Sequence, residues 1–177
     1  MNLTIRKADI KDAAAIAHVH VESWKTTYAG IVPDVFLASL NKEERMRSWQ
    51  EQILADNIFI FVAEEETGIF GFAAGGKIRE KLDDYDAELY AIYLLRERQR
   101  EGVGRTLGLT LASALQTSGF TSMIVWVLEQ NPSVSFYKRL GAVQIARKII
   151  NIGGADLQEL ALGWLSLDRL IAAGDQR

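Results

Sequence analysis

The stretch Gln99-Arg100-Glu101-Gly102-Val103-Gly104-Arg105 decides the fold, because it joins a strand to a helix. Before it, Leu89 to Leu95 is an almost unbroken apolar and aromatic segment of strand length. After it, apolar residues recur at helical spacing: Val103, Leu107, Leu111 and Leu115. A glycine-rich turn of this kind exposes the first unpaired N–H groups of the helix to a ligand. It predicts a phosphate or pyrophosphate site, which the charges of Arg98, Arg100 and Arg105 favour.

The composition is that of a globular protein of 177 residues with a formal net charge of −3. This length suits one domain, and the lack of a basic excess argues against nucleic acid as a partner. The sequence has no cysteine, which excludes disulfides, thiolate metal sites and a cysteine nucleophile. We also find neither an apolar run long enough to span a membrane nor a signal-peptide core. We therefore expect a cytoplasmic protein without a membrane partner.

The first part of the chain predicts a strand followed by helices. Leu3 to Lys7 alternates like a strand, and a helical apolar pattern then extends from Asp9, the expected N-cap, to Tyr28. A short apolar piece around residues 35–40 follows. Asn41 is expected to cap a second helix, in a capping box with the glutamate three residues on.

The remaining chain predicts two hairpins around a β-α-β-α unit. The hairpins cover residues 58–78 and 143–165, and the unit comprises a strand at 87–95, a helix from 103, a strand at 121–128 and a helix after Asn131-Pro132. The two strands of the unit should be parallel and joined by a right-handed crossover. Ligands in such sheets bind beyond the carboxyl ends of adjacent parallel strands. Both the glycine turn and Asn131 lie there.

Three kinds of ligand site use a glycine turn at a helix start. The P-loop pattern is absent, and the dinucleotide pattern G-x-G-x-x-G fails because Gly108 follows Gly104 one residue late. The third kind fits. Gln99-x-x-Gly102-x-Gly104, followed by Asn131 and by Phe136-Tyr137-Lys138-Arg139-Leu140-Gly141, resembles the GNAT superfamily of acyl-CoA-dependent N-acetyltransferases, in particular its bacterial small-molecule members. The likeness covers nearly the whole chain.

The resemblance implies an α/β (α+β) fold with a mixed, mostly antiparallel sheet of about seven strands. Its fourth and fifth strands would splay apart in a V, and helices would flank both faces. A single N-acetyltransferase domain would span residues 1–177. Residues 1–56 would form the acceptor side, residues 57–140 the acyl-CoA-binding core, and residues 141–177 a C-terminal hairpin and tail.

The resemblance also implies acetyl-CoA as co-substrate and no metal. The backbone of Ile92, Tyr93 and Leu94 would hold the pantetheine arm, as a peptide-like ligand adds to an open strand edge. The pyrophosphate would contact Gln99, Arg100, Glu101, Gly102, Val103, Gly104 and Arg105. Asn131 and Tyr137 would also contact the cofactor, and Asn131 equally fits a plain N-cap. The alternative is a tight turn without a ligand.

Moving an acetyl group to an amine requires a neutral amine and a proton for the departing thiolate. An alkylamine with a pKa of about 10.4 is protonated at neutral pH, so a group or water must accept a proton. Because the chain has no cysteine, direct attack in a ternary complex is favoured over a covalent intermediate.

By its position in the resemblance, Glu88 is the candidate base, as in the histone-acetylating members. Its alternative is an edge-strand glutamate that faces solvent, with Tyr90 and Tyr93 ordering a water instead. Tyr137 matches the family tyrosine that protonates the thiolate, and its alternative is a core tyrosine beside Phe136.

The expected acceptor is a primary amine of a small molecule, such as an amino acid or a polyamine. Trp24 and Tyr28, together with Glu88 and Tyr90, are candidate acceptor contacts, and the acidic side chains of residues 80–86 would attract a cation. His18 and His20 point to different faces of a helix, which argues against a metal. Alternatives are a non-catalytic acyl-CoA-binding or sensing domain, a protein N-acetyltransferase and a nucleotide-binding domain. A monomer and a homodimer both stay open.

Overall fold

The computed structural model describes residues 3–82 and 84–174. One seven-stranded sheet has the order β1-β2-β3-β4-β5-β7-β6. The strands are β1 (Thr4–Lys7), β2 (Ile58–Glu65), β3 (Gly68–Lys77), β4 (Ala87–Leu94), β5 (Met123–Leu128), β6 (Val143–Ile152) and β7 (Ala155–Trp164). The α-helices are α1 (Ala13–Thr27), α2 (Asp34–Ser39), α3 (Lys42–Leu54), α4 (Val103–Thr117), α5 (Ser133–Arg139) and α6 (Leu167–Gly174). Among neighbouring strands of the described residues only β4 and β5 are parallel, which confirms the mixed sheet.

The helix caps form where the sequence places them. The carboxylate of Asp9 accepts the Lys11 N–H at 3.0 Å, and a 3₁₀ turn, η1 (Ile10–Asp12), then leads into α1. Asn41 accepts two backbone N–H groups at the start of α3, at 2.8 and 3.1 Å. Two short helices, α2 and α6, exceed the prediction: the apolar piece after Pro33 is helical, and so is the tail after β7. Both are short helices, whose stability comes mainly from packing rather than from local pattern.

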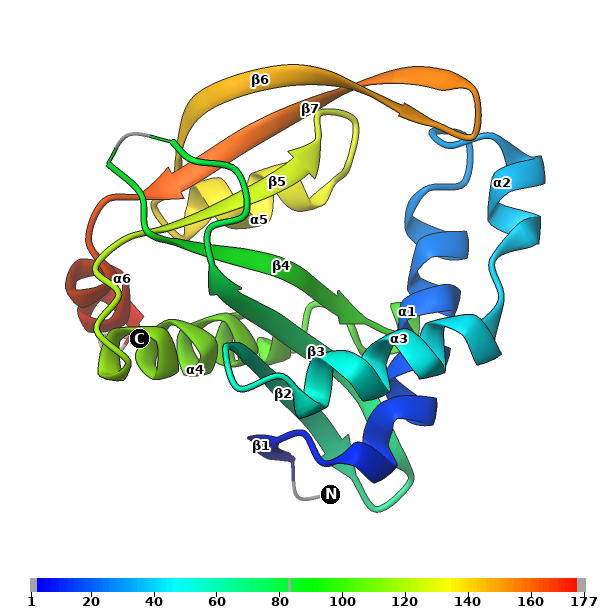
Figure 1. Cartoon of the computed structure of the whole chain (residues 1–177), viewed down its shortest axis with the longest axis horizontal. Coiled ribbons are helices and arrows are strands. Elements are labelled where there is room, and N and C mark those ends of the chain that lie inside the picture. Colours follow the sequence, from blue (N-terminus) through cyan, green and yellow to red (C-terminus); the bar gives the residue numbers. More distant parts are fainter. Residues whose placement is uncertain (1–2, 83, 175–177) are drawn as a thin grey trace.

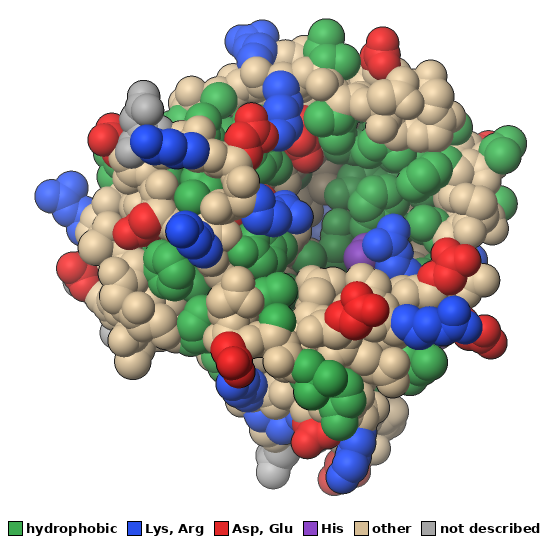
Figure 2. All heavy atoms as spheres, in the orientation of Figure 1, with side chains coloured by type: hydrophobic (Ala, Val, Ile, Leu, Met, Phe, Trp, Pro, Cys, Tyr) green, Lys and Arg blue, Asp and Glu red, His purple; other side chains and the backbone are tan. Residues whose placement is uncertain are grey.

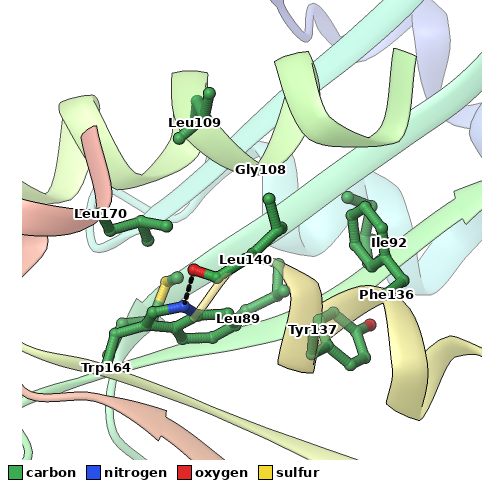
Figure 3. Close-up of a pocket in the computed structure, with 10 residues that line it drawn as sticks. Leu89, Ile92, Gly108, Leu109, Phe136, Tyr137, Leu140, Trp164 and Leu170 are labelled. Atoms are coloured by element: carbon green, nitrogen blue, oxygen red, sulfur yellow. Dashed lines mark hydrogen bonds between the residues drawn. The ribbon is translucent and has the colours of Figure 1, made fainter. Parts of the chain in front are cut away.

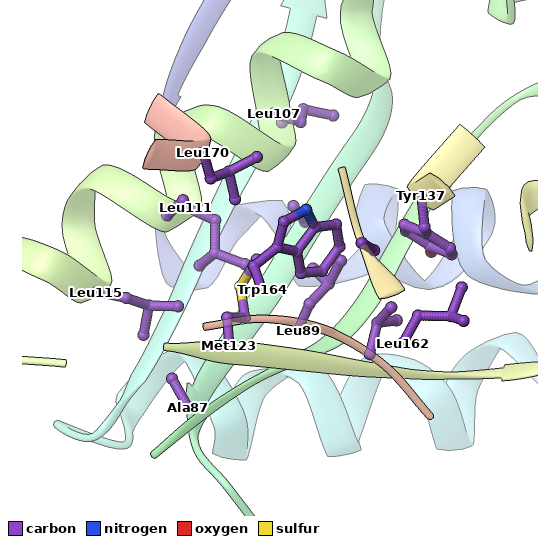
Figure 4. Packing of buried hydrophobic residues seen from close by; sticks show 14 of the residues in the cluster. Ala87, Leu89, Leu107, Leu111, Leu115, Met123, Tyr137, Leu162, Trp164 and Leu170 are labelled. Atoms are coloured by element: carbon purple, nitrogen blue, oxygen red, sulfur yellow. The ribbon is translucent and has the colours of Figure 1, made fainter. Parts of the chain in front are cut away.

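Helices cover both faces of the sheet, as the fold prediction requires (Figure 1). On one face, α4 packs against β2, β3 and β4, and its predicted leucine stripe belongs to a core that also includes side chains of β5 and β7. Helix α6 closes the end of this core (Figure 4). On the other face, α1 and α3 pack on β2, β3 and β4 around Phe72 and Trp49. Each fully buried leucine contributes about 1.5–3 kcal/mol relative to exposure. The two cores fix β4 from both sides.

The parallel pair β4–β5 is short and then opens. Only three residues of β4 pair with β5, and the last pair is Leu89↔Val125. The register between β3 and β4 passes from Gly75↔Leu89 to Ala74↔Ala91, so Tyr90 is an extra residue on β4. Such a bulge bends the strand. Beyond it β4 and β5 diverge, as Figure 1 shows, which confirms the predicted V-shaped splay.

The segment between β3 and β4 is more structural than the exposed loop that the sequence predicts. The Asp86 carboxylate accepts the backbone N–H groups of Thr121 and Ser122 at 2.9 and 3.0 Å. It therefore fixes the start of β5 rather than offering charge to an amine. Asp83, part of the same expectation, lies outside the described residues. Within residues 3–82 and 84–174, no helix is both long and apolar enough to cross a membrane.

Candidate active site

The inner edge of β4 carries backbone groups that no strand pairs. Leu95 N–H donates to the Phe70 carbonyl of the neighbouring strand segment at 2.9 Å. Because directions alternate along an antiparallel ladder, the N–H and C=O groups of Ile92 and Leu94 point the other way, into the V. The Leu94 carbonyl accepts Ser23 Oγ at 3.2 Å and Gln99 Nε2 at 3.1 Å. By the same alternation the backbone of Tyr93 faces β3 rather than the V.

The glycine turn leads into α4 without a side-chain cap. Gly102 has a φ of +84° and precedes the first helical residue, and no side chain caps the helix. A Cβ on Gly104 would lie 3.4 Å from Leu94 Cδ1 and 3.7 Å from Phe136 Cζ. The first N–H groups of α4 are thus available to an anion at the mouth of the V. These N–H groups indicate the anion site more clearly than the nearby arginine side chains do.

Two of the three arginines expected to favour a phosphate are engaged elsewhere. Arg98 forms an ion pair with Glu65 at 2.6 Å and stacks over the Phe70 ring at 3.9 Å. Arg105 donates to the carbonyls of Ala173 and Gly174, both at 3.0 Å, where α6 ends. Their side chains therefore hold the corner together, and the expected contribution of these two guanidinium groups to phosphate binding is not supported by their geometry.

A small apolar cavity lies between β4, α4 and α5 (Figure 3). Ile92, Gly108 and Phe136 line its outer side, and the hydrogen bond from Trp164 Nε1 to the Leu140 carbonyl, at 2.9 Å, closes its inner side. Sequence reasoning missed Phe136 and Gly108 as lining residues. Their signal was the helical register that places Gly104 and Gly108 on one face of α4.

Tyr137 stands where the cavity meets the V. The residue is 5% exposed, and its ring makes edge contacts with Phe136 and Trp164. Burial, with the nearby Tyr28, raises the pKa of the phenol well above its usual value. No residue that the structure describes forms a hydrogen bond with its hydroxyl, which points away from Trp164 in Figure 3. The group is therefore a protonated donor without a partner.

Aromatic residues beside Tyr137 are joined by hydrogen bonds. Trp24 Nε1 donates to the Tyr93 hydroxyl at 3.0 Å, and Asn131 Nδ2 donates to the Tyr28 hydroxyl at 3.2 Å. The Asn131 Oδ1 accepts the N–H of Ser133 at 2.8 Å. Helix α5 begins at Ser133 with Pro132 at the N-cap position, one residue later than the sequence predicts. The Asn131 side chain still binds the first helical N–H, and it also fixes Tyr28. The network brings the candidate acceptor residues of α1 next to β4 and the start of α5.

Glu88 is buried at the closed end of the V. It is 1% exposed, and its two oxygens accept the Arg79 backbone N–H at 3.1 Å and the Arg79 guanidinium at 2.5 Å. The reading of Glu88 as an edge-strand side chain facing solvent is therefore wrong, because β4 is a central strand. The Arg79 guanidinium also lies over the Tyr90 ring at 4.6 Å, and the Tyr90 hydroxyl donates to the Lys77 carbonyl at 2.5 Å.

A hollow lined by hydrophobic side chains opens between the β6–β7 hairpin and the helices of the N-terminal part (Figure 2). The hollow contains Trp24 of α1, Tyr28 directly after α1 and Phe36 of α2. These side chains pack with Ile150 and Leu157 of the hairpin. A Cβ on Gly153 would lie 2.6 Å from Phe36 Cβ, so the hairpin turn touches α2. The contact closes one end of the cleft.

His20 borders the same cleft as a neutral side chain. Its Nδ1 accepts Trp49 Nε1 at 3.1 Å, and its ring stacks on Tyr93 with centroids 5.3 Å apart. Burial lowers the pKa of its imidazole to about 3. His18 instead contacts Lys42 Nζ through Nδ1 at 2.9 Å. In the described part of the chain no three potential metal-binding side chains gather.

Comparison with known proteins supports the same fold and activity. A model of the family described as FR47-like protein matches residues 66–150. The chain is 47% identical to the uncharacterized N-acetyltransferase YuaI of Bacillus subtilis over 95% of this chain and 96% of that protein. It is 30% identical to spermidine N(1)-acetyltransferase of Thermoplasma acidophilum over 80% of this chain and 88% of that protein.

Two solved structures are similar along nearly their whole length. PaiA N-acetyltransferase of Thermoplasma acidophilum, in complex with coenzyme A, has a TM-score of 0.71 and 26% identity over 90% of this chain and 98% of its own. YncA of Salmonella typhimurium, with its cofactor acetyl-CoA, has a TM-score of 0.72 and 27% identity over 95% of each chain. With its splayed β4–β5 pair and these relatives, the chain belongs to the GNAT superfamily of N-acetyltransferases.

Proposed function

We propose that this protein uses acetyl-CoA to acetylate a primary amine of a small molecule, by direct attack in a ternary complex. One observation carries the proposal: the open edge of β4, the uncapped start of α4 and the Tyr137 hydroxyl converge on a single V-shaped opening. The relatives solved with coenzyme A and with acetyl-CoA support the choice of cofactor.

Backbone groups would make most of the cofactor contacts. The N–H and C=O of Ile92 and the N–H of Leu94 suit the two amide groups of a pantetheine arm, in the manner of an added strand. The amides from Gly102 to Arg105 suit its pyrophosphate. Gln99 would act indirectly, because its side chain donates to the Leu94 carbonyl. Neither set of contacts requires an arginine side chain.

Tyr137 is the proposed acid for the departing thiolate. A thiol has a pKa of about 8.5, below that of the buried phenol, so the phenol keeps its proton until a thiolate forms next to it. The amine nitrogen bonds to the thioester carbonyl carbon. As the C–S bond then breaks, the proton moves from the tyrosine oxygen to the leaving sulfur, and water returns a proton to the phenolate. This is general acid catalysis, which contributes about 10²–10⁴-fold.

Glu88 would serve as a base only through a water. Arg79 binds both of its carboxylate oxygens, so an amine cannot displace that partner without leaving the guanidinium unpaired. A water ordered between this pair and the V could pass a proton toward the carboxylate. Tyr90, whose hydroxyl is bound to Lys77, would line that path rather than accept the proton.

The cleft favours a small amine over a polypeptide acceptor. Contact between Phe36 and Gly153 closes one end, so an extended chain cannot pass along the sheet without moving the hairpin. Trp24 and Tyr28 give the cleft an aromatic wall, which attracts an alkylammonium group. The 30% identical spermidine acetyltransferase makes a polyamine a good first choice.

Thiol release from acetyl-CoA across a library of primary amines tests this function. We expect at least one amine to be acetylated by the wild type, and Tyr137→Phe to lower kcat by about 10²–10⁴-fold without changing coenzyme A affinity. Tyr85→Phe, outside the V, is the matched control and should keep wild-type kcat. Binding of coenzyme A with no thiol release for any amine would favour the non-catalytic sensing domain instead.

A further inference from the structure

A second glutamate projects toward the acceptor cleft. Glu159 of β7 lies opposite Leu128 of β5 and Lys148 of β6 in the register of the sheet. Directly opposed residues of antiparallel strands project to the same face. Leu128 packs against Tyr28 and the residues of α2, and so does Leu157, two positions before Glu159. The Glu159 carboxylate therefore lies on the cleft face of the sheet.

This carboxylate is poorly compensated. The Glu159 side chain is 17% exposed, and its closest cation among the described residues is Lys148 Nζ at 4.0 Å. Burial raises its pKa, Lys148 and Arg79 lower it, and nearby carboxylates raise it again. The charged or titratable groups around it come from four other parts of the fold: Lys148, Glu88, Arg79, Glu80 and Tyr28. A partly desolvated carboxylate of this kind gains free energy when a cation binds it.

The contrast with Glu88 is sharp. Glu88 is saturated by Arg79, whereas no described residue donates a hydrogen bond to the Glu159 carboxylate. Both side chains occupy the same face of the sheet, because Glu88 pairs with Ile124 and Glu159 lies beyond it along β7. Of the two, Glu159 can bind a ligand cation without breaking a hydrogen bond, since Lys148 Nζ approaches it only to 4.0 Å.

A primary ammonium already lies beside Glu159. Lys148 Nζ is 3.9 Å from the centre of the Trp126 ring, pairs with Glu80 and approaches Glu159 to 4.0 Å. Trp126 and Glu159 belong to neighbouring strands and share the cleft face. An aromatic ring with carboxylates at its edge is a suitable environment for an alkylammonium head group. The protein's own lysine thus shows the chemistry that this wall accepts.

We propose that Glu159 binds the ammonium of the acceptor and so determines specificity for primary alkylamines, including the end of a polyamine. This inference deepens the proposed function and rests on it for its effect on turnover. Lys148 would compete with the ligand, because its ammonium group already lies close to the Glu159 carboxylate. The affinity for the acceptor would therefore depend on both residues.

Calorimetric titration of the full chain, saturated with coenzyme A, with spermidine and with butylamine tests the proposal. We expect Glu159→Gln to weaken binding by about tenfold or more, which corresponds to about 1.4 kcal/mol. Glu129→Gln, an exposed glutamate beside β5, is the matched control and should change affinity by less than about twofold. If Glu159→Gln binds as the wild type does, or if the wild type binds neither amine, the proposal is wrong.

A second variant makes the test independent of any folding defect in Glu159→Gln. Lys148→Met keeps the aliphatic cover over Trp126 but removes the competing charge, so we expect it to bind both amines more tightly than the wild type. Weaker or unchanged binding contradicts the proposal. Wild-type affinity should also fall as the pH drops and Glu159 takes up a proton, and this fall should be absent in Glu159→Gln.

Thiol release separates this inference from the proposed function. If Glu159→Gln loses amine binding while the wild type releases no thiol from acetyl-CoA, acetyl transfer is wrong and Glu159 as the ammonium site stands. If the wild type releases thiol and Glu159→Gln keeps the wild-type KM for the amine, acetyl transfer stands and Glu159 as the ammonium site is wrong. A raised KM with nearly unchanged kcat supports both.

Discussion

The two ends of β4 differ in their partners. At the closed end, Ala87 and Leu89 are buried, β5 pairs with the strand, and Arg79 satisfies Glu88. At the open end, past the bulge at Tyr90, β4 still pairs with β3, but the backbone N–H and C=O groups of Ile92 and Leu94 that face the V have no partner in β5. One strand thus supplies stability at one end and a binding edge at the other. The extra residue at Tyr90 separates the two roles.

Breaking the closed end should have the largest effect on stability. Arg79→Met would leave Glu88, which is 1% exposed, with the backbone N–H of residue 79 but without the guanidinium. We expect a loss of about 2 kcal/mol of unfolding free energy, less than for a fully buried pair because Arg79 is partly exposed. Urea unfolding measures it, with Lys81→Met as the control. An unchanged midpoint would show that the pair is not structural.

Filling the open end should instead affect binding. In Gly104→Val the added methyl groups would project toward Leu94 and Phe136, which lie 3.4 and 3.7 Å from an ideal Cβ at that position. We expect coenzyme A affinity to fall by about tenfold, or 1.4 kcal/mol, with little change in stability. Thr117→Val, at the far end of α4, also places a valine on this helix and should bind normally. Equal affinities of the two variants would place the cofactor elsewhere.

The pH dependence of stability should carry a signature of the open end. His20, stacked on Tyr93, has a pKa lowered by burial to about 3, whereas the unfolded chain has a histidine pKa near 6.5. Between these pH values the unfolded chain binds a proton at His20 that the folded chain does not bind. The contribution of His20 to the free energy of unfolding is therefore fully present above pH 6.5 and is lost as the pH decreases. The slope reaches at most about 1.4 kcal/mol per pH unit.

Urea unfolding at neutral pH and near pH 5 compares this slope in the wild type and in His20→Gln, which keeps an acceptor for Trp49. We expect a shallower dependence in the variant. Parallel curves would mean that the imidazole takes up its proton without disturbing the folded state.

Removing Arg105 should have the smallest effect on binding. Its guanidinium is bonded to the Ala173 and Gly174 carbonyls, so Arg105→Gln should change coenzyme A affinity by less than about threefold. A fluorescence titration with coenzyme A suffices. A tenfold loss of coenzyme A affinity would instead indicate that Arg105 contacts the phosphate directly, as the sequence suggests.

The parts of the fold that sequence predicted are those with strong local signals. The Asp9 and Asn41 caps, the leucine stripe of α4 and the glycine turn each follow from side-chain chemistry over a few residues. The V-shaped splay followed from the resemblance rather than from local pattern. The bulge at Tyr90 leaves no local signal, since an extra residue is defined only by the register with β3.

The acceptor side was harder to predict, because its groups meet only in three dimensions. Glu159 and Lys148 lie directly opposite each other on the neighbouring strands β7 and β6. The sequence gives no local signal for this pair, because both strands carry other polar residues, such as Gln158 and Arg147. The pairing of Glu88 with Arg79 depends on the turn of the loop between β3 and β4. Because that turn brings Arg79 to Glu88, the Glu88 side chain is buried rather than facing solvent. Likewise, whether Arg105 reaches a phosphate or α6 depends on a helix that the sequence pattern did not reveal.

Amide hydrogen exchange, with and without coenzyme A, tests most directly whether the open end of β4 holds the cofactor. We expect the amides of Ala87 to Leu89 to be protected in both states, and those of Ile92, Leu94 and Gly102 to Arg105 to exchange rapidly until coenzyme A protects them. Protection of Ile92 and Leu94 before the cofactor is added, or unchanged exchange after it binds, would contradict the assignment of this edge as the cofactor site.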